Sequence, residues 1–146
     1  MNKQITTENI SSAEWDVMRI IWTLDQAKCS EIIAELKPKN NWSESTIKTL
    51  IRRLIEKGIV SADKTGRTFT YSATVSENEM MYQVAKGMFS NMCDMHKGQL
   101  LIRLIKELPL SKSAIQEIQT ELTQMEKVAP ETVPCDCLSK NKKHQC

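Results

Sequence analysis

The sequence predicts a mainly α-helical (α+β) fold, in which a winged helix-turn-helix precedes a helical dimerisation region and a cysteine-rich tail. Three observations support this fold class. Capped amphipathic helices lead into one alternating hairpin, the second half shows only helical periodicity, and three of the five cysteines fall in the last twelve residues. We expect residues 1–75 to form the winged-helix domain, 76–128 the helical dimerisation region and 129–146 the flexible tail.

Composition excludes several classes of protein. The chain has 146 residues, of which 40% are hydrophobic, so it can form one domain or a small module with an appendage. A balance of 20 basic and 18 acidic residues excludes a uniformly basic nucleic-acid coat and an acidic disordered protein. No apolar run approaches the roughly 18 residues of a membrane span, and the N-terminus has no secretory-type stretch. We therefore expect a cytoplasmic protein with no membrane partner.

Two helices are predicted before residue 40. Ser11 and Glu14 form a capping box, and the apolar stripe that follows extends to Leu24. A second, short helix is expected to begin near Ser30 and to end at Pro38, because proline disrupts a helix interior.

A third, basic helix begins after Ser43 and ends before Gly58. One face of this helix is apolar, and the opposite face carries Ser45, Lys48, Thr49, Arg52 and Arg53. Residues 37–71 contain eight basic and three acidic residues, so a local positive charge is hidden by the near-neutral total.

A hairpin follows directly within residues 60–71, with its turn expected at Lys64-Thr65-Gly66-Arg67. Helix, short helix, basic helix and hairpin is the order of a winged helix-turn-helix, whose basic helix enters the major groove of double-stranded DNA. The predicted DNA contacts are Ser45, Lys48, Thr49 and Arg52 near the bases, Arg53 and Lys57 at the backbone, and Arg67 at the wing. The alternative is a solvated helix face with ordinary surface charge.

The second half is predicted to be helical and incomplete by itself. A long stripe extends from Met81 to Met95, Leu101–Leu108 follow the same spacing up to Pro109, and residues 113–127 have a narrow heptad-like seam. These faces are too small to close a core, so we expect a homodimer. Cys29, Cys93 and the five methionines from Met80 to Met95 are expected to pack as core residues, although Cys93 and His96 could together ligate a metal.

The tail is a candidate metal site. Cys135 and Cys137 form a C-x-C pair, and His144 and Cys146 follow as H-x-C. Thiolates select Zn(II) or Cu(I), three sulfurs suit trigonal Cu(I), and three sulfurs with His144 suit tetrahedral zinc. The alternative is an exposed C-terminus with no selected ligand. The chain is not expected to be an enzyme, because it has two histidines, no phosphate-binding glycine loop and no nucleophile elbow.

The basic helix and its flanks resemble the recognition segment of the penicillinase repressor superfamily. The resemblance is carried by Trp42-Ser43, by residues 45–54 (STIKTLIRRL) with Lys57-Gly58, and by the first-helix residues 13–18 (AEWDVM) with Trp22; Gly66-Arg67 and Tyr71 match its wing. The cysteine-rich tail resembles that of the CopY-type copper-responsive repressors.

This resemblance implies a function. Such dimers hold an inverted-repeat operator of TACA…TGTA type in the zinc form and leave it when Cu(I) displaces zinc, which derepresses copper-export genes. The resemblance also implies a copper chaperone as a partner. The tail departs from the family pattern, because the usual second C-x-C pair is reduced to His144-x-Cys146. Two other functions stay open: a beta-lactam-responsive repressor with an incidental tail, and a metal buffer or chaperone that does not bind DNA.

Overall fold

A computed structural model describes residues 10–139 and 146. The described chain divides into two compact units, the first ending at Gly87 and the second beginning at Met88. Helix α4 (Glu77–Ser90) crosses this boundary. Unit 1 and unit 2 are treated separately below, and the domain boundaries predicted at residues 75 and 128 stay a prediction.

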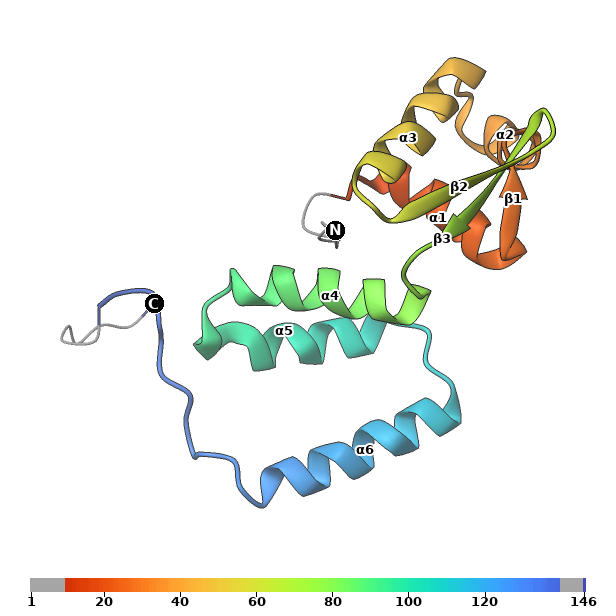
Figure 1. The fold of residues 1–146 in the computed structure, drawn as a ribbon. Helices are drawn as coiled ribbons and strands as arrows, with labels where there is room; N and C mark the ends of the chain where they lie inside the picture. Colours follow the sequence, from red (N-terminus) through yellow and green to blue (C-terminus); the bar gives the residue numbers. More distant parts are fainter. Residues whose placement is uncertain (1–9, 140–145) are drawn as a thin grey trace. The chain divides into compact units, whose positions relative to one another are not determined.

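Unit 1 has the predicted winged helix-turn-helix order (Figure 1). Its elements are α1 (Ser12–Leu24), β1 (Gln26–Lys28), α2 (Cys29–Asn40), α3 (Glu44–Glu56), β2 (Val60–Thr65), β3 (Thr68–Ala73) and the start of α4. The capping box predicted before α1 is present: the Glu14 amide donates to Ser11 Oγ at 3.1 Å, and the Ser11 amide donates to the Glu14 carboxylate at 3.4 Å. Sequence and structure therefore agree on the fold class.

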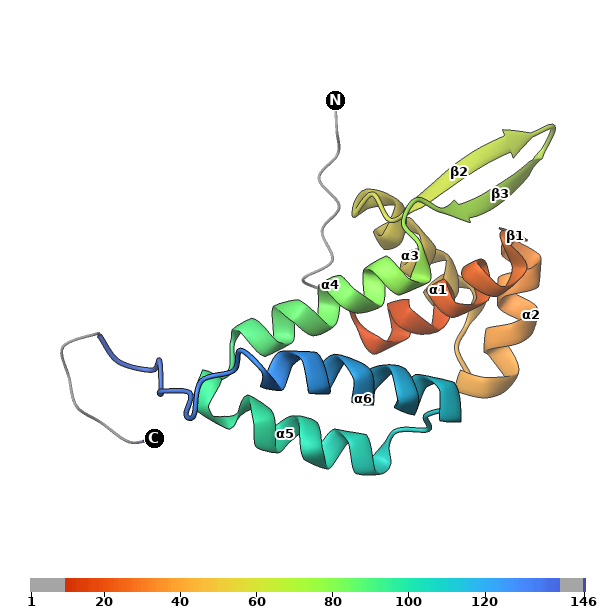
Figure 2. The same cartoon turned by 90° about the horizontal axis from the view of Figure 1, so that it is seen from below.

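The strands of the described chain form an antiparallel sheet in the order β1-β3-β2. Ala27 pairs with Tyr71 and Val60 pairs with Ala73. The hairpin of β2 and β3 was predicted, and it extends as a two-stranded ribbon past the helices of unit 1 (Figure 2). Strand β1 was not predicted, because three residues with one buried side chain are too short to show an alternating pattern.

The prediction that Pro38 ends the second helix is wrong. Helix α2 continues to Asn40, and Pro38 lies within its last turn. The helix ends where Asn41 adopts a left-handed conformation, with φ of 53°, and donates its amide to the Lys37 carbonyl at 3.1 Å. A left-handed asparagine at the C-terminus therefore sets this boundary.

The core of unit 1 lies between α1, α2 and α3 and includes one residue of α4. Its fully buried large side chains are Met18, Ile21, Ile32, Leu36, Ile47, Leu54, Ile59, Met80 and Val17. The Trp22 indole donates to the Val75 carbonyl at 3.0 Å, which fixes the chain just before α4. Cys29 packs partly buried against this core, as expected.

Unit 2 contains α5 (Asp94–Glu107) and α6 (Lys112–Glu126). The expected stripe from Met81 to Met95 is interrupted at residues 91–93, where α4 has ended and α5 has not begun. The prediction of methionine core packing is confirmed for Met80, which is fully buried, but not within this single chain for Met81, Met88 and Met95, which are 53%, 58% and 43% exposed. Within the described residues, α5 and α6 have no buried side chain. No helix in the described ranges is both long and apolar enough to cross a membrane.

Candidate nucleic-acid interface and metal centre

Helix α3 has one buried face and one exposed basic face. Ser43 Oγ accepts a hydrogen bond from the Thr46 amide at 3.2 Å, so the start of the helix is fixed by an N-cap. The Lys48, Arg52 and Arg53 side chains are exposed. The buried residues of the opposite face are Ile47, Leu50, Ile51 and Leu54. Since the apolar face fixes the rotation of the helix in unit 1, the three cations face solvent.

The two predicted hydroxyl contacts of α3 are engaged within the helix. Thr49 Oγ1 donates to the Ser45 carbonyl at 2.9 Å, and Ser45 Oγ lies 3.1 Å from Ser43 Oγ. Arg52 Nε lies 3.9 Å from Glu56 Oε1, but these side chains are 70% and 67% exposed. A pair so exposed contributes little, so it does not hold the guanidinium away from another anion.

The hairpin turn presents a second cation. Gly66 adopts a φ of 65°, a left-handed conformation that favours glycine and allows a tight connection between β2 and β3. Arg67 follows in this turn and is exposed. Lys64 Nζ lies 5.6 Å from the centroid of the Phe69 ring, and Phe69 is 45% exposed. The end of the wing is therefore positively charged and carries one exposed aromatic side chain.

Helix α3 and the wing share one groove, here called the wing groove. Lys48 from α3 and Arg67 from the turn both line it, and its volume is about 320 Å³. The remaining lining residues are Lys28, Cys29, Ser30, Thr68, Phe69 and Tyr71. Cations from separate elements thus meet at one concave surface, which suits a polyanion.

A neutral thiol and phenol lie in the same groove. Burial raises the pKa of the Cys29 thiol; Glu44 raises it further, while Lys48 acts in the opposite direction. Burial also raises the pKa of the Tyr71 hydroxyl, with a smaller contribution from Cys29. Both groups are therefore neutral at neutral pH, and the charge of the groove comes from its lysine and arginine side chains.

An ion pair joins α1 to the end of α3. Lys57 Nζ lies 2.9 Å and 2.7 Å from the two carboxylate oxygens of Glu14, which is 3% exposed. Burial by itself raises the pKa of Glu14, but hydrogen bonds from Lys57 and Ser11 outweigh it and lower the pKa overall. The Lys57 ammonium therefore pairs with Glu14 inside unit 1, and its predicted contact with the DNA backbone stays a prediction.

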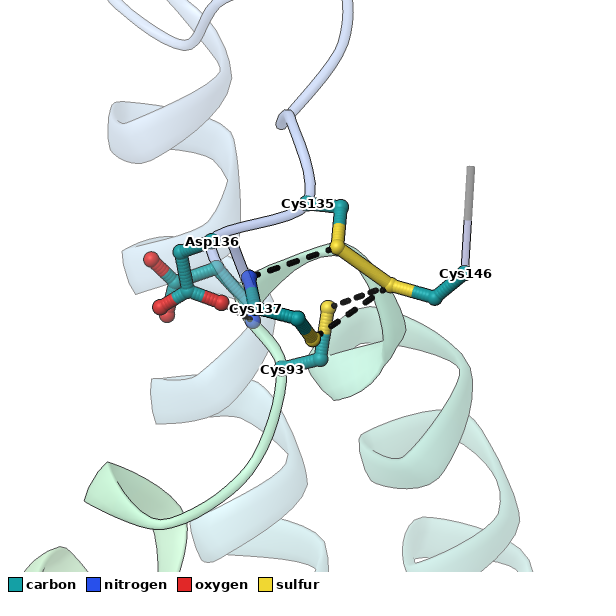
Figure 3. Close-up of a disulfide and its surroundings, with 6 residues drawn as sticks. Cys93, Cys135, Asp136, Cys137 and Cys146 are labelled. Atoms are coloured by element: carbon teal, nitrogen blue, oxygen red, sulfur yellow. Dashed lines mark hydrogen bonds between the residues drawn. A yellow bond between two sulfur atoms is a disulfide. The ribbon is translucent and has the colours of Figure 1, made fainter. Parts of the chain in front are cut away.

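Four cysteine sulfurs converge in unit 2 (Figure 3). The Sγ atoms of Cys93, Cys135, Cys137 and Cys146 all lie within 4.8 Å of one another, and we call this set the thiol cluster. Cys146 Sγ is 3.2 Å from Cys93 Sγ and 3.5 Å from Cys137 Sγ. Cys135 and Cys146 form a disulfide, so metal ligation by all four sulfurs requires the reduced chain. Four soft sulfur donors fit zinc or Cu(I) better than a hard cation.

Asp136 anchors the tail at the start of α5. Its Oδ1 accepts a hydrogen bond from the Asp94 backbone amide at 3.0 Å, while Cys93 is the N-cap residue of α5 and makes no side-chain cap itself. The Asp94 amide holds the pKa of Asp136 below its ordinary value. Lys97 Nζ lies 2.6 Å from Asp94 Oδ1, and the pKa of Lys97 is raised by this partner. The tail thus supplies the missing helix cap.

The structure brings together three of the four predicted metal ligands. Cys135, Cys137 and Cys146 lie in the thiol cluster, and His144 lies outside the described residues. The sequence pattern assigned Cys93 to core packing, whereas the structure places its sulfur in the cluster. The sequence signal for this position is the pair Cys93-Asp94, where α5 begins. The apolar stripe from Met81 to Met95 runs through the pair and hides the break between α4 and α5.

An exposed basic helix beside a basic wing defines this molecule as a winged-helix protein of the DNA-binding class. Residues 10–124 match the family model described as "Penicillinase repressor". The chain is 46% identical over 132 residues to an uncharacterized 16.5 kDa protein of Latilactobacillus sakei, with 90% of each chain covered. It is 34% identical over 118 residues to the methicillin resistance regulatory protein MecI of Staphylococcus aureus, which covers 81% of this chain and 96% of MecI.

A solved structure titled "CopR Repressor Structure" is 43% identical, with 47% of this chain and 99% of that chain covered and a TM-score of 0.41. The chain belongs to the penicillinase repressor family, on the basis of the family model and the MecI relationship. It is a DNA-binding transcriptional repressor, and its family is one of repressors rather than enzymes.

Proposed function

We propose that the chain is a dimeric, copper-responsive repressor that binds an inverted-repeat operator of TACA…TGTA type in its zinc form. Cu(I) at the tail cysteines releases the operator and derepresses genes for copper export and homeostasis. It acts in the cytoplasm, where its operator lies. The observation that carries this proposal is the thiol cluster, since four sulfurs within 4.8 Å match the donor preference of zinc and Cu(I).

The DNA contacts in this proposal come from α3 and the wing. Lys48 and Arg67 line the wing groove together, which supports a continuous basic surface for one half-site. Arg52 and Arg53 extend it along the exposed face of α3. Thr49 Oγ1 donates to the Ser45 carbonyl, and Ser45 Oγ shares a hydrogen bond with Ser43 Oγ. Both hydroxyl oxygens keep acceptor capacity, so each can accept a hydrogen bond from DNA without losing its present partner.

The second copy in this proposal covers unit 2. Helices α5 and α6 have no buried side chain, and Leu101, Ile105 and Leu122 are 47%, 44% and 52% exposed. Helices this apolar need another layer to exclude water, and the heptad-like seam of α6 suits packing against a helix. A homodimer also provides the two-fold symmetry that an inverted-repeat operator requires.

The tail residues that would hold metal are Cys135, Cys137 and Cys146, with His144 as the further predicted ligand. Zinc prefers four ligands, whereas Cu(I) accepts two or three. Replacement of zinc by Cu(I) would therefore change the number of tail residues bound to the metal. Delivery of Cu(I) by a copper chaperone stays a prediction.

The test is an anaerobic Cu(I) titration of reduced, zinc-loaded protein on a labelled TACA…TGTA duplex. Zinc release and DNA anisotropy are followed in the same sample. We expect both signals to change over the same range of added Cu(I). The variant Cys135→Ser/Cys137→Ser should bind the operator and lose the copper response, whereas Arg52→Ala should weaken the operator complex in either metal state.

Each alternative function has its own outcome in this titration. DNA retained after copper has saturated the protein would overturn copper sensing, and cleavage in cells exposed to a beta-lactam would then favour an antibiotic-responsive repressor. Metal binding without any DNA complex, even at low salt, would favour a metal buffer, because basic DNA-binding proteins gain affinity as salt falls.

A further inference from the structure

We propose that Cys93 is a ligand of the same metal as the tail cysteines, and that Asp136 is the positioning residue that docks the tail onto the start of α5. The metal then ties the C-terminal tail to the junction between α4 and α5. This inference rests on the metal binding in the proposed function and adds a route by which the tail acts on the helical region.

The position of Cys93 in the chain makes it different from the other three sulfurs. It precedes the first residue of α5, whereas Cys135, Cys137 and Cys146 belong to the tail. A metal bound by the tail alone would constrain only the tail. When Cys93 also binds, the metal closes a loop of the chain that contains α5 and α6, which lie between Cys93 and Cys135.

The geometry of the sulfurs supports shared ligation. Cys93 Sγ lies 3.2 Å from Cys146 Sγ, and all four sulfurs lie within 4.8 Å of one another. Sulfur ligands of one tetrahedral zinc ion, at about 2.3 Å from the metal, are separated by roughly 4 Å, so small shifts of the reduced side chains suffice. Cys93 thus supplies the fourth sulfur that the tail lacks.

Asp136 is held between Cys135 and Cys137 and reaches the same junction. Its carboxylate accepts the hydrogen bond of the backbone amide of Asp94, the residue after Cys93, at 3.0 Å. A carboxylate at a helix N-terminus satisfies an amide that otherwise has no partner within the helix. This contact orients the C-x-C pair toward Cys93 without itself ligating the metal.

The first test counts ligands in the reduced full-length protein loaded with Co(II) as a spectroscopic substitute for zinc. Thiolate-to-cobalt charge-transfer absorption scales with the number of sulfur ligands. We expect Cys93→Ser to lose about a quarter of this absorption, as one of four sulfurs, while the matched control Cys29→Ser keeps all of it. Equal spectra of wild type and Cys93→Ser, with cobalt bound, would overturn the role of Cys93 and leave the proposed function intact.

The second test uses alkylation followed by mass spectrometry. Zinc should protect Cys93 from alkylation in the wild type, and the protection should disappear in Cys135→Ser/Cys137→Ser, which lacks two tail ligands. Protection that persists without metal would show that burial rather than ligation shields Cys93, and would overturn the inference. No metal bound by the wild type at all would instead overturn the proposed function.

The role of Asp136 is tested by metal affinity. We expect Asp136→Ala to weaken zinc binding about tenfold, the lower end of the effect of groups that orient metal ligands, with an unchanged ligand count. Asp136→Asn, which keeps an acceptor oxygen, should recover part of the affinity, and the tail control Glu131→Ala should match the wild type. Equal affinities for Asp136→Ala and Glu131→Ala would refute the positioning role.

Discussion

Removal of the wing arginine should reduce the salt dependence of operator binding by a calculable amount. Four exposed cations of each chain are predicted DNA contacts, Lys48, Arg52, Arg53 and Arg67, and a dimer neutralises eight phosphates if each cation neutralises one. At about 0.9 per neutralised phosphate, the slope of log K against log salt is roughly −7. Raising the salt from about 50 to 200 mM should then weaken the complex about 10⁴-fold. Arg67→Ala removes two cations per dimer and should make the slope less negative by about 1.8.

The assay is fluorescence anisotropy of a labelled operator at four or more salt concentrations between these limits. The matched control is Arg19→Ala, an exposed arginine of α1 that lines another hollow together with Asp16 and Glu35. This control should keep the wild-type slope. An Arg67→Ala slope equal to that of Arg19→Ala would refute the placement of the wing on phosphate, whatever happened to the affinity at one salt concentration.

Three further predictions concern stability and assembly. Lys57→Met should destabilise unit 1 by about 2 kcal/mol in urea unfolding, because it leaves the Glu14 carboxylate buried without its ammonium, whereas Lys48→Met should cost under about 0.5 kcal/mol. The pKa of Glu14 is lowered from 4.5 in the folded chain, so the ion pair stabilises unit 1 fully above pH 4.5 and loses this effect as the pH falls through the folded-state pKa. A stability difference between wild type and Lys57→Met that grows in acid would contradict this reasoning. Gly66→Ala should cost about 1 kcal/mol at its φ of 65°, while Gly98→Ala within α5 should stabilise slightly, both by thermal unfolding. Ile105→Glu should shift sedimentation toward monomer, and an unchanged dimer would refute the assignment of α5 to the interface.

Much of unit 1 could be predicted from the sequence because its signals are local. The capping box at Ser11 and the N-cap at Ser43 involve residues three positions apart, and both are present in the structure. The hairpin was predicted for the same reason. Strand β1 escaped prediction because its pairing with β3 joins residues such as Ala27 and Tyr71, far apart in the chain.

The candidate functional residues also divide into those with a local sequence signal and those whose partners are far away in the chain. Lys48 and Arg67 were predicted from a helical face and a turn, although their common groove is a property of the folded chain alone. Lys57 looked like another cation of that face, and its pairing with Glu14, 43 residues earlier, could not be seen in the local pattern. Cys93 was missed because its partners lie 42 to 53 residues later, where no periodicity connects them.

Cys29 differs from the cysteines of the thiol cluster, because its sulfur is not grouped with other sulfurs in the described residues. Its thiol lies in the wing groove, where burial raises its pKa, and the described residues place its sulfur outside the thiol cluster. A protonated, solitary thiol competes poorly for a soft metal against a site where several sulfur donors bind the same ion. Cys29 belongs to unit 1 and the thiol cluster to unit 2. If the cluster binds Cu(I) as proposed, Cys29 should stay unligated, and the wing groove should keep its charge when copper is added.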